Sequence, residues 1–265
     1  MPITLDARRD FALNVVKLSL WLAKALAARG ETLEDALTAR TNIYRLTSLF
    51  DGKHHPAWKS PDWRDEHWER LLAELRAIYA RHYADADTAA LEAEGLALLQ
   101  PLLEARLERD VNDWPQCGDR PFGFFRYDPP AVQSPDSIGL HFANPFAPRS
   151  PFEDIAARAG ELSRLLDEVQ ARTPQVAIVR TGTWLNSFKP FQNFYPPEWT
   201  ASASPPSPLA YHYGWWGQFI DRTGAFHRKN GALLRQTGQF PFPCVNCQCS
   251  VESLRRHLKT NFGAG

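Results

Sequence analysis

The chain has 265 residues and a mass of 30.0 kDa, a length that fits one compact domain or two lobes. Thirty basic and thirty acidic side chains give a formal net charge of zero, and 44% of the residues are hydrophobic. This composition excludes a disordered or collagen-like chain, and it lacks the positive charge that drives non-specific binding to nucleic acids. We therefore expect a globular protein without a nucleic-acid partner.

Large rigid side chains are frequent, with 9 Trp, 16 Phe and 21 Pro against a single Met. Such a composition favours aromatic-lined cavities. Polar and charged residues interrupt the apolar stretch 11–26, which fits neither a signal peptide nor a membrane span. We expect a cytoplasmic protein without a membrane partner, in which the four cysteines stay reduced.

Residues 1–112 have the composition and the spacing of apolar residues that are typical of helices. The predicted helices span 6–29, 33–50, a segment from Pro61 through Ile78, and 87–109. Pro101 lies inside the last of these, so a kink or break is expected near Leu99. The first lobe is thus predicted to be entirely helical.

Residues 113–265 are richer in Pro, Gly and aromatic residues. The predicted strands are 122–127, 138–144, 176–181, 211–220 and 239–243, and the predicted helices are 151–172, 226–235 and 250–258. The sequence therefore predicts an α+β fold, with a helical lobe at 1–112 followed by a mixed-sheet lobe at 113–265.

A helix-start signal stands at 149–153, where Ser150 precedes Pro151 and Glu153 follows three residues after the serine. This pattern is typical of a capping box. One interpretation is that it only begins a helix. The other is that the free N–H groups, together with Arg149, bind a phosphate or carboxylate.

His141 alternates with Leu140 and Phe142 along a predicted strand, so its side chain is expected on the opposite face. A buried, hydrogen-bonded structural role is one interpretation, and a general base is the other. The segment 180–199 follows a buried strand and mixes polar with aromatic side chains, including Thr183, Trp184 and Asn186. That mixture is typical of a small-molecule pocket, although core and lid packing fit it equally.

Three cysteines, Cys244, Cys247 and Cys249, are close together, with Cys117 and His227 as possible further metal ligands. Alternate residues of an extended chain face the same way, so all three thiols converge only if the chain turns at 245–246. We expect ordinary thiols and no metal, with a reactive nucleophile as a further alternative. His54-His55 and Glu66/Glu69 have no partners at ligand spacing, and the chain has no glycine-rich phosphate loop and no G-x-S-x-G motif.

Several segments of the second half are similar to those of bacterial GNAT-like acyltransferases that carry a helical N-terminal domain. The segments are FGFFRYDP, IGLHFANPF, VAIVRTGTWLNSFKPFQNFYPPEW and FHRKNGALLRQTGQFPF. The resemblance implies a mixed sheet and a helix whose start, at Arg149, Ser150 and Phe152, receives the pyrophosphate of coenzyme A. The phosphate-loop pattern of that family is matched only in its first half, at 228–231.

The resemblance implies an enzyme that moves an acyl group from a thioester of coenzyme A or a carrier protein to an amine of a small molecule. The expected pocket lies between 149–153 and 183–199. His141 or His227 would accept the proton, and Thr183 or Asn186 would orient the acyl carbonyl. The alternative is a non-catalytic module that binds a small ligand or peptide through residues 183–199, which we call the aromatic loop. In that case the histidines are structural.

Overall fold

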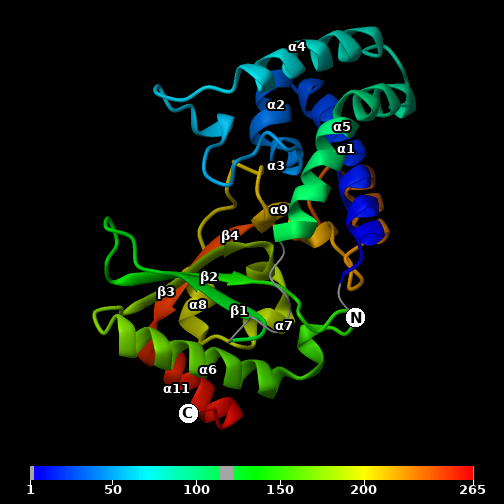
Figure 1. The fold of residues 1–265 in the computed structure, drawn as a ribbon. Coiled ribbons are helices and arrows are strands. Elements are labelled where there is room, and N and C mark those ends of the chain that lie inside the picture. The colour runs from blue at the N-terminus through cyan, green and yellow to red at the C-terminus, as the bar shows by residue number, and fades with distance from the viewer. Residues whose placement is uncertain (1–2, 114–121, 265) are drawn as a thin grey trace. The chain divides into compact units, whose positions relative to one another are not determined.

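Helices and one open sheet make up the chain, which is α+β and 55% helical in the computed structural model (Figure 1). The structure describes residues 3–113 and 122–264. Within these ranges, no helix has the length and hydrophobicity that crossing a bilayer requires.

The chain divides into two units. The helical unit contains the described residues 3–113 and 208–241, and the sheet unit contains 122–207 and 242–264. This division differs from the predicted lobes, because 208–241 group with the N-terminal helices. The side chain of Asp10 accepts the N–H of Phe226 at 3.0 Å, and Arg235 pairs with Glu92 through two contacts of 2.8 Å.

The helical unit contains α1 (Leu5–Ala27), α2 (Leu33–Ala39), α3 (Ile43–Leu46), η1 (Pro56–Trp58), α4 (Glu66–Arg81), α5 (Ala89–Asp113), α9 (Tyr213–Trp216), η5 (Gly217–Phe219) and α10 (Arg228–Thr237). The predicted helix 33–50 is in fact two short helices. Helix α4 begins at Glu66, because the side chain of Asp65 accepts the N–H of Trp68 at 2.9 Å and caps that turn. Helix α5 continues through Pro101.

The predicted aromatic strand at 211–220 is wrong, since this segment forms α9 and η5. His212 caps the turn by accepting the N–H of Gly214 at 3.1 Å, and the indole N–H of Trp216 donates to the carbonyl of Ala210 at 2.5 Å. These bonds fold the segment back on itself and bury Trp215 and Trp216.

The sheet unit has four strands in the order of the sequence: β1 (Phe125–Asp128), β2 (Ser137–Phe142), β3 (Ile178–Thr183) and β4 (Val245–Ser250). The central pair β2–β3 is parallel and both outer pairs are antiparallel, so the sheet is mixed. The predicted strand 239–243 is wrong: the last strand begins at Val245.

The helices of the sheet unit are η3 (Pro151–Glu153), α6 (Ile155–Arg172), η4 (Trp184–Ser187), α7 (Lys189–Gln192), α8 (Pro197–Ala201) and α11 (Val251–Phe262). Helices α6 and α11 lie side by side (Figure 1). They bury one face of the sheet in an apolar core that includes Val179, Cys247 and Leu254. The other face carries exposed polar side chains, among them Arg126, Asp128, His141, Arg180 and Gln248.

Candidate functional site

The predicted capping box at Ser150 is confirmed. The hydroxyl of Ser150 accepts the N–H of Phe152 at 3.2 Å, and Glu153 accepts the N–H of Ser150 at 3.1 Å. It opens only the three-residue η3. The longer helix α6 begins at Ile155, where Asp154 accepts the N–H of Ala157 at 2.9 Å. A carboxylate of the protein thus occupies the helix start at which an external anion was expected, and this geometry favours the structural interpretation.

Asn186, a candidate for orienting an acyl group, is 3% exposed and holds three parts of the sheet unit together. Its amide group donates to the carbonyls of Thr181 at 3.0 Å and Val245 at 2.9 Å. Its side-chain oxygen accepts the indole N–H of Trp199 at 3.1 Å. The nearby hydroxyl of Thr183 is buried and accepts the N–H of Leu185 at 3.3 Å. Both side chains thus form hydrogen bonds to other residues of the sheet unit.

Aromatic rings fill the space in which the pocket was expected. Phe152, at the helix start, lies edge-on to Phe188 of the aromatic loop, with ring centres 5.3 Å apart. Trp184 packs against Phe242 at 5.6 Å. Arg149 is exposed, and its carbonyl accepts the side-chain amide of Asn144 at 2.8 Å. The helix start and the aromatic loop are therefore neighbours, as predicted, but they contact each other directly.

His141 lies on the polar face of the sheet and its side chain is 49% exposed, so the expectation of a buried histidine is wrong. Its Nε2 lies 2.5 Å from Oδ2 of Asp128. The aromatic loop packs on the opposite, covered face. His227 belongs to the helical unit, where its Nδ1 accepts the N–H of Asn230 at 3.2 Å and caps α10. The structure thus gives the two predicted histidines separate roles.

A hollow of about 550 Å³ lies beside the aromatic loop, within the sheet unit. Its walls come from the start of α6, from the α7–α8 segment and from the C-terminal end of α11. Pro196, Pro197 and Phe262 supply apolar surface. We call this feature the α7–α8–α11 hollow. It adjoins the predicted pocket, but the residues from α11 were missed by sequence analysis.

A histidine with a defined tautomer lines the α7–α8–α11 hollow. Nε2 of His257 lies 3.1 Å from the carbonyl oxygen of Asn193, to which it can only donate. Nδ1 then accepts the amide of Asn261 at 3.2 Å. The neutral ring with its proton on Nε2 satisfies both contacts. His257 and Asn261 are four residues apart on α11, so they share one face of that helix.

Among the described residues that line the α7–α8–α11 hollow, Lys189 is the one with a permanent charge. None of these lining residues is an aspartate or a glutamate. Its side chain is exposed, and within the described ranges no acidic group pairs with it. Tyr195 also lines the hollow and stacks on Trp199, with ring centres 3.9 Å apart. Burial raises the pKa of Tyr195, which keeps the phenol neutral. The hollow therefore has a positive electrostatic character.

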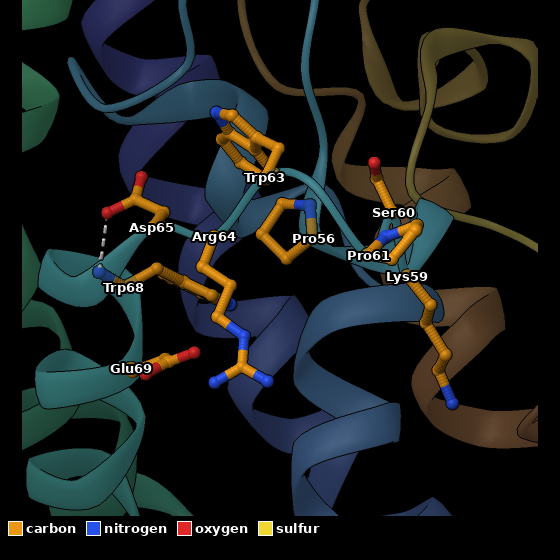
Figure 2. A pocket seen from close by; sticks show the side chains of 9 residues that line it. All are labelled: Pro56, Lys59, Ser60, Pro61, Trp63, Arg64, Asp65, Trp68 and Glu69. Carbon is orange, nitrogen blue, oxygen red and sulfur yellow. Dashed lines mark hydrogen bonds between the residues drawn. The ribbon is translucent and has the colours of Figure 1, made fainter.

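A second hollow, of about 290 Å³, lies in the helical unit and is lined by residues of 56–69 (Figure 2). Figure 2 shows the side chains of Trp63 and Arg64 extending in opposite directions from the chain. Asp65, in its wall, accepts the N–H of Trp68 and the hydroxyl of Tyr44 at 2.8 Å. This hollow is smaller, and Asp65 already has a structural function, so it is the weaker candidate.

The cysteines of β4 are buried in the core. Cys247 and Cys249 share its covered face, and residues 245–246 continue the strand instead of turning. Burial raises the pKa of Cys244 to about 12, of Cys247 to about 11 and of Cys249 to about 12, so these thiols stay protonated near neutral pH. Among the described residues, no three His, Cys, Asp or Glu side chains gather as metal ligands. Cys117 lies outside the described residues.

No protein-family model matches the chain, and no curated protein or solved structure matches it either. The functional argument therefore depends on the geometry of the described residues.

Proposed function

We propose that the sheet unit binds a small organic anion in the α7–α8–α11 hollow. The observation that carries this proposal is the hollow itself, whose volume of about 550 Å³ lies within the range of small-molecule sites. It combines apolar walls, one cationic side chain and a histidine–asparagine pair of fixed geometry. This is the binding-module alternative of the sequence analysis, moved to a neighbouring position.

The lining residues define the chemical class of the ligand. Pro196, Pro197 and Phe262 contribute apolar lining, and Lys189 attracts a negative charge. The side-chain amide of Gln192 donates to the carbonyl of Asn186 at 2.7 Å, so its oxygen remains as an acceptor. A molecule with an aromatic or aliphatic body, one carboxylate and a hydrogen-bond donor satisfies these groups.

A thermal-shift series with benzoate, phenylacetate and indole-3-acetate tests the proposal on the full chain. We expect at least one of them to raise the melting temperature in proportion to ligand concentration. Lys189→Met should weaken binding tenfold or more, and Thr200→Trp should abolish it by filling the hollow. Lys259→Met, an exposed lysine on α11, is the matched control and should bind normally. Binding that is unchanged by both site variants would contradict the proposal.

Acyl transfer from a thioester of coenzyme A or a carrier protein is a second proposal, favoured by the contact between His141 and Asp128. The carboxylate of Asp128 lies at Nε2 and orients the imidazole, and an oriented imidazole is the side chain that most often accepts a proton in general base catalysis. In the described part of the chain, Nδ1 of His141 has no hydrogen-bond partner. Arg126, its cross-strand neighbour, and Arg180 add positive charge to this exposed face.

The two proposals make different demands on the variants. Acetyl-coenzyme A with a panel of primary amines should give His141-dependent turnover, and His141→Gln should lower the rate a hundredfold or more. Ligand binding in the α7–α8–α11 hollow should survive that substitution, because His141 faces the other side of the sheet. Turnover that is absent in the unsubstituted protein, or unaffected by His141→Gln, would contradict the acyl-transfer proposal alone.

A further inference from the structure

The core of the helical unit contains buried polar atoms that have no hydrogen-bond partner. They include Nδ2 and Oδ1 of Asn42, Nε of Arg45 and Nε2 of His55. Asn42 is fully buried and His55 is 1% exposed. More than nine in ten buried polar groups in proteins find a partner, and three of these four atoms, Nδ2 of Asn42, Nε of Arg45 and Nε2 of His55, can donate to an acceptor.

Arg45 and His55 lie beside the same aromatic ring. The guanidinium carbon of Arg45 is 4.5 Å from the centre of Phe50, and the ring of His55 is 6.4 Å from it. Tyr211 stacks on His55 with ring centres 4.1 Å apart. Burial, the charge of Arg45 and the neighbouring His212 lower the pKa of His55 to about 3, so its ring stays neutral near neutral pH.

The positive charge of Arg45 is not compensated. Among residues 3–113 and 208–241, no carboxylate forms an ion pair with it. Arg106, whose guanidinium carbon lies 5.6 Å from the centre of Phe50, is balanced by Asp110 at 2.8 Å. Asp65 is not available to Arg45, because it accepts the hydroxyl of Tyr44 and caps α4. A partly buried cation without an anion is unfavourable unless a ligand supplies the negative charge.

The tautomer of His55 makes its Nε2 a hydrogen-bond donor. Nδ1 of His55 accepts the N–H of Ala57 at 3.1 Å, so the proton of the neutral ring lies on Nε2. Nε of Arg45 is likewise a donor. A water molecule could accept from both groups, but it would leave the charge of Arg45 uncompensated. An oxyanion accepts both hydrogen bonds and neutralises the charge.

We propose that Arg45 and His55 bind a small oxyanion, the phosphate or carboxylate group of a ligand, against the aromatic rings of Phe50 and Tyr211. Asn42 stands three residues before Arg45, at the start of α3, where its amide adds a further donor. This site lies in the helical unit and is independent of the function proposed for the sheet unit.

Arginine Nε–H resonances of the full-length ¹⁵N-labelled protein test the proposal. Sodium phosphate and sodium acetate are titrated separately, with sodium chloride holding the ionic strength constant. We expect the Arg45 resonance, identified by its loss in Arg45→Met, to move saturably with at least one of the two anions. The anion that binds more tightly distinguishes phosphate from carboxylate as the recognised group. An Arg45 resonance that moves no more than that of the exposed Arg70 with either anion would overturn the proposal.

Matched variants provide a second measurement. Arg45→Met should weaken affinity for the preferred anion at least tenfold by calorimetry, whereas Arg70→Met, at an exposed arginine of α4, should leave it unchanged. Because Arg45→Met removes an uncompensated charge, we expect this variant to stay folded in the absence of anion. If it unfolds, the titration of the unsubstituted protein tests the proposal. Equal anion affinity in folded Arg45→Met and in Arg70→Met would overturn the proposal.

Discussion

Replacing Asn186 with alanine separates a structural role from a functional one at a residue that sequence analysis placed in the site. The substitution removes two donated hydrogen bonds, of 3.0 Å and 2.9 Å, and one accepted bond of 3.1 Å. It leaves the carbonyls of Thr181 and Val245 and the indole N–H of Trp199 without this partner. Trp199 is fully buried, so solvent reaches its N–H only if the structure opens.

The size of the effect follows from these three groups. A buried polar group that loses its partner costs about 1–3 kcal/mol. A water molecule in the space left by the amide recovers part of that cost. We therefore expect Asn186→Ala to lower the free energy of unfolding by about 3–5 kcal/mol. Asn186→Asp keeps the shape but places an anion beside two carbonyl oxygens, so its effect should diminish at acidic pH, where the carboxyl becomes neutral.

Urea unfolding, followed by tryptophan fluorescence and circular dichroism, measures the loss of unfolding free energy. We expect the urea concentration at the midpoint to fall while the dependence of the free energy on urea stays unchanged. Asn193→Ala is the control, because Asn193 is exposed and its effect should stay within about 0.5 kcal/mol. A loss below about 1 kcal/mol in Asn186→Ala, combined with abolished ligand binding, would refute the structural reasoning.

Three further predictions concern other parts of the chain. The pKa of His55 is about 3 in the folded protein and 6.5 in the unfolded chain. As the pH falls, His55 is therefore protonated in the unfolded state at a higher pH than in the folded state. His55 alone should therefore lower the unfolding free energy by about 2 kcal/mol between pH 7 and pH 5, and His55→Gln should reduce this pH dependence in urea titrations. In a Cys117→Ser background, Cys247 and its buried neighbours should react with a thiol reagent far more slowly in the native protein than in urea; equal rates would show that they are accessible. Gly123→Ala should lower the free energy of unfolding by about 2–4 kcal/mol, because Gly123 has a φ of +54° and an added Cβ would meet the carboxylate of Glu161. Gly30 has a φ of +98° but open space around it, so Gly30→Ala should lower the free energy of unfolding by less in the same assay.

Local signals in the sequence predicted the parts of the fold that short-range chemistry decides. The capping serine at 150 is confirmed, as are the end of the following helix at Arg172 and the start of the last helix at Ser250. In each case, one or two side chains satisfy the backbone groups at the end of the element. The sequence also predicted the mixed sheet, although it located only some of the strands.

The aromatic segment 211–220 shows why other elements were missed. A short run of Tyr and Trp suits a strand as well as a buried helical turn, and its period cannot distinguish them. The decision came from His212 and from the bond between Trp216 and Ala210, which are side-chain contacts of the folded segment. Tertiary packing likewise placed 208–241 in the helical unit.

The candidate sites depend on contacts between distant residues, which a single sequence does not reveal. His257 receives its orientation from Asn193, and His55 stacks on Tyr211. The aromatic loop contains the tryptophan that the sequence analysis selected, whereas the residues of α11 that line the hollow belong to a helix with an ordinary hydrophobic pattern. A histidine and an asparagine four residues apart near the end of that helix were the available signal.

Mass spectrometry of the small molecules released from natively purified protein tests whether the α7–α8–α11 hollow binds a ligand. Unsubstituted protein and Thr200→Trp are purified in parallel from identical cells and denatured under the same conditions. We predict one small organic anion enriched in the unsubstituted protein and absent from Thr200→Trp. Identical profiles of released molecules from the two proteins would contradict a ligand site in the hollow.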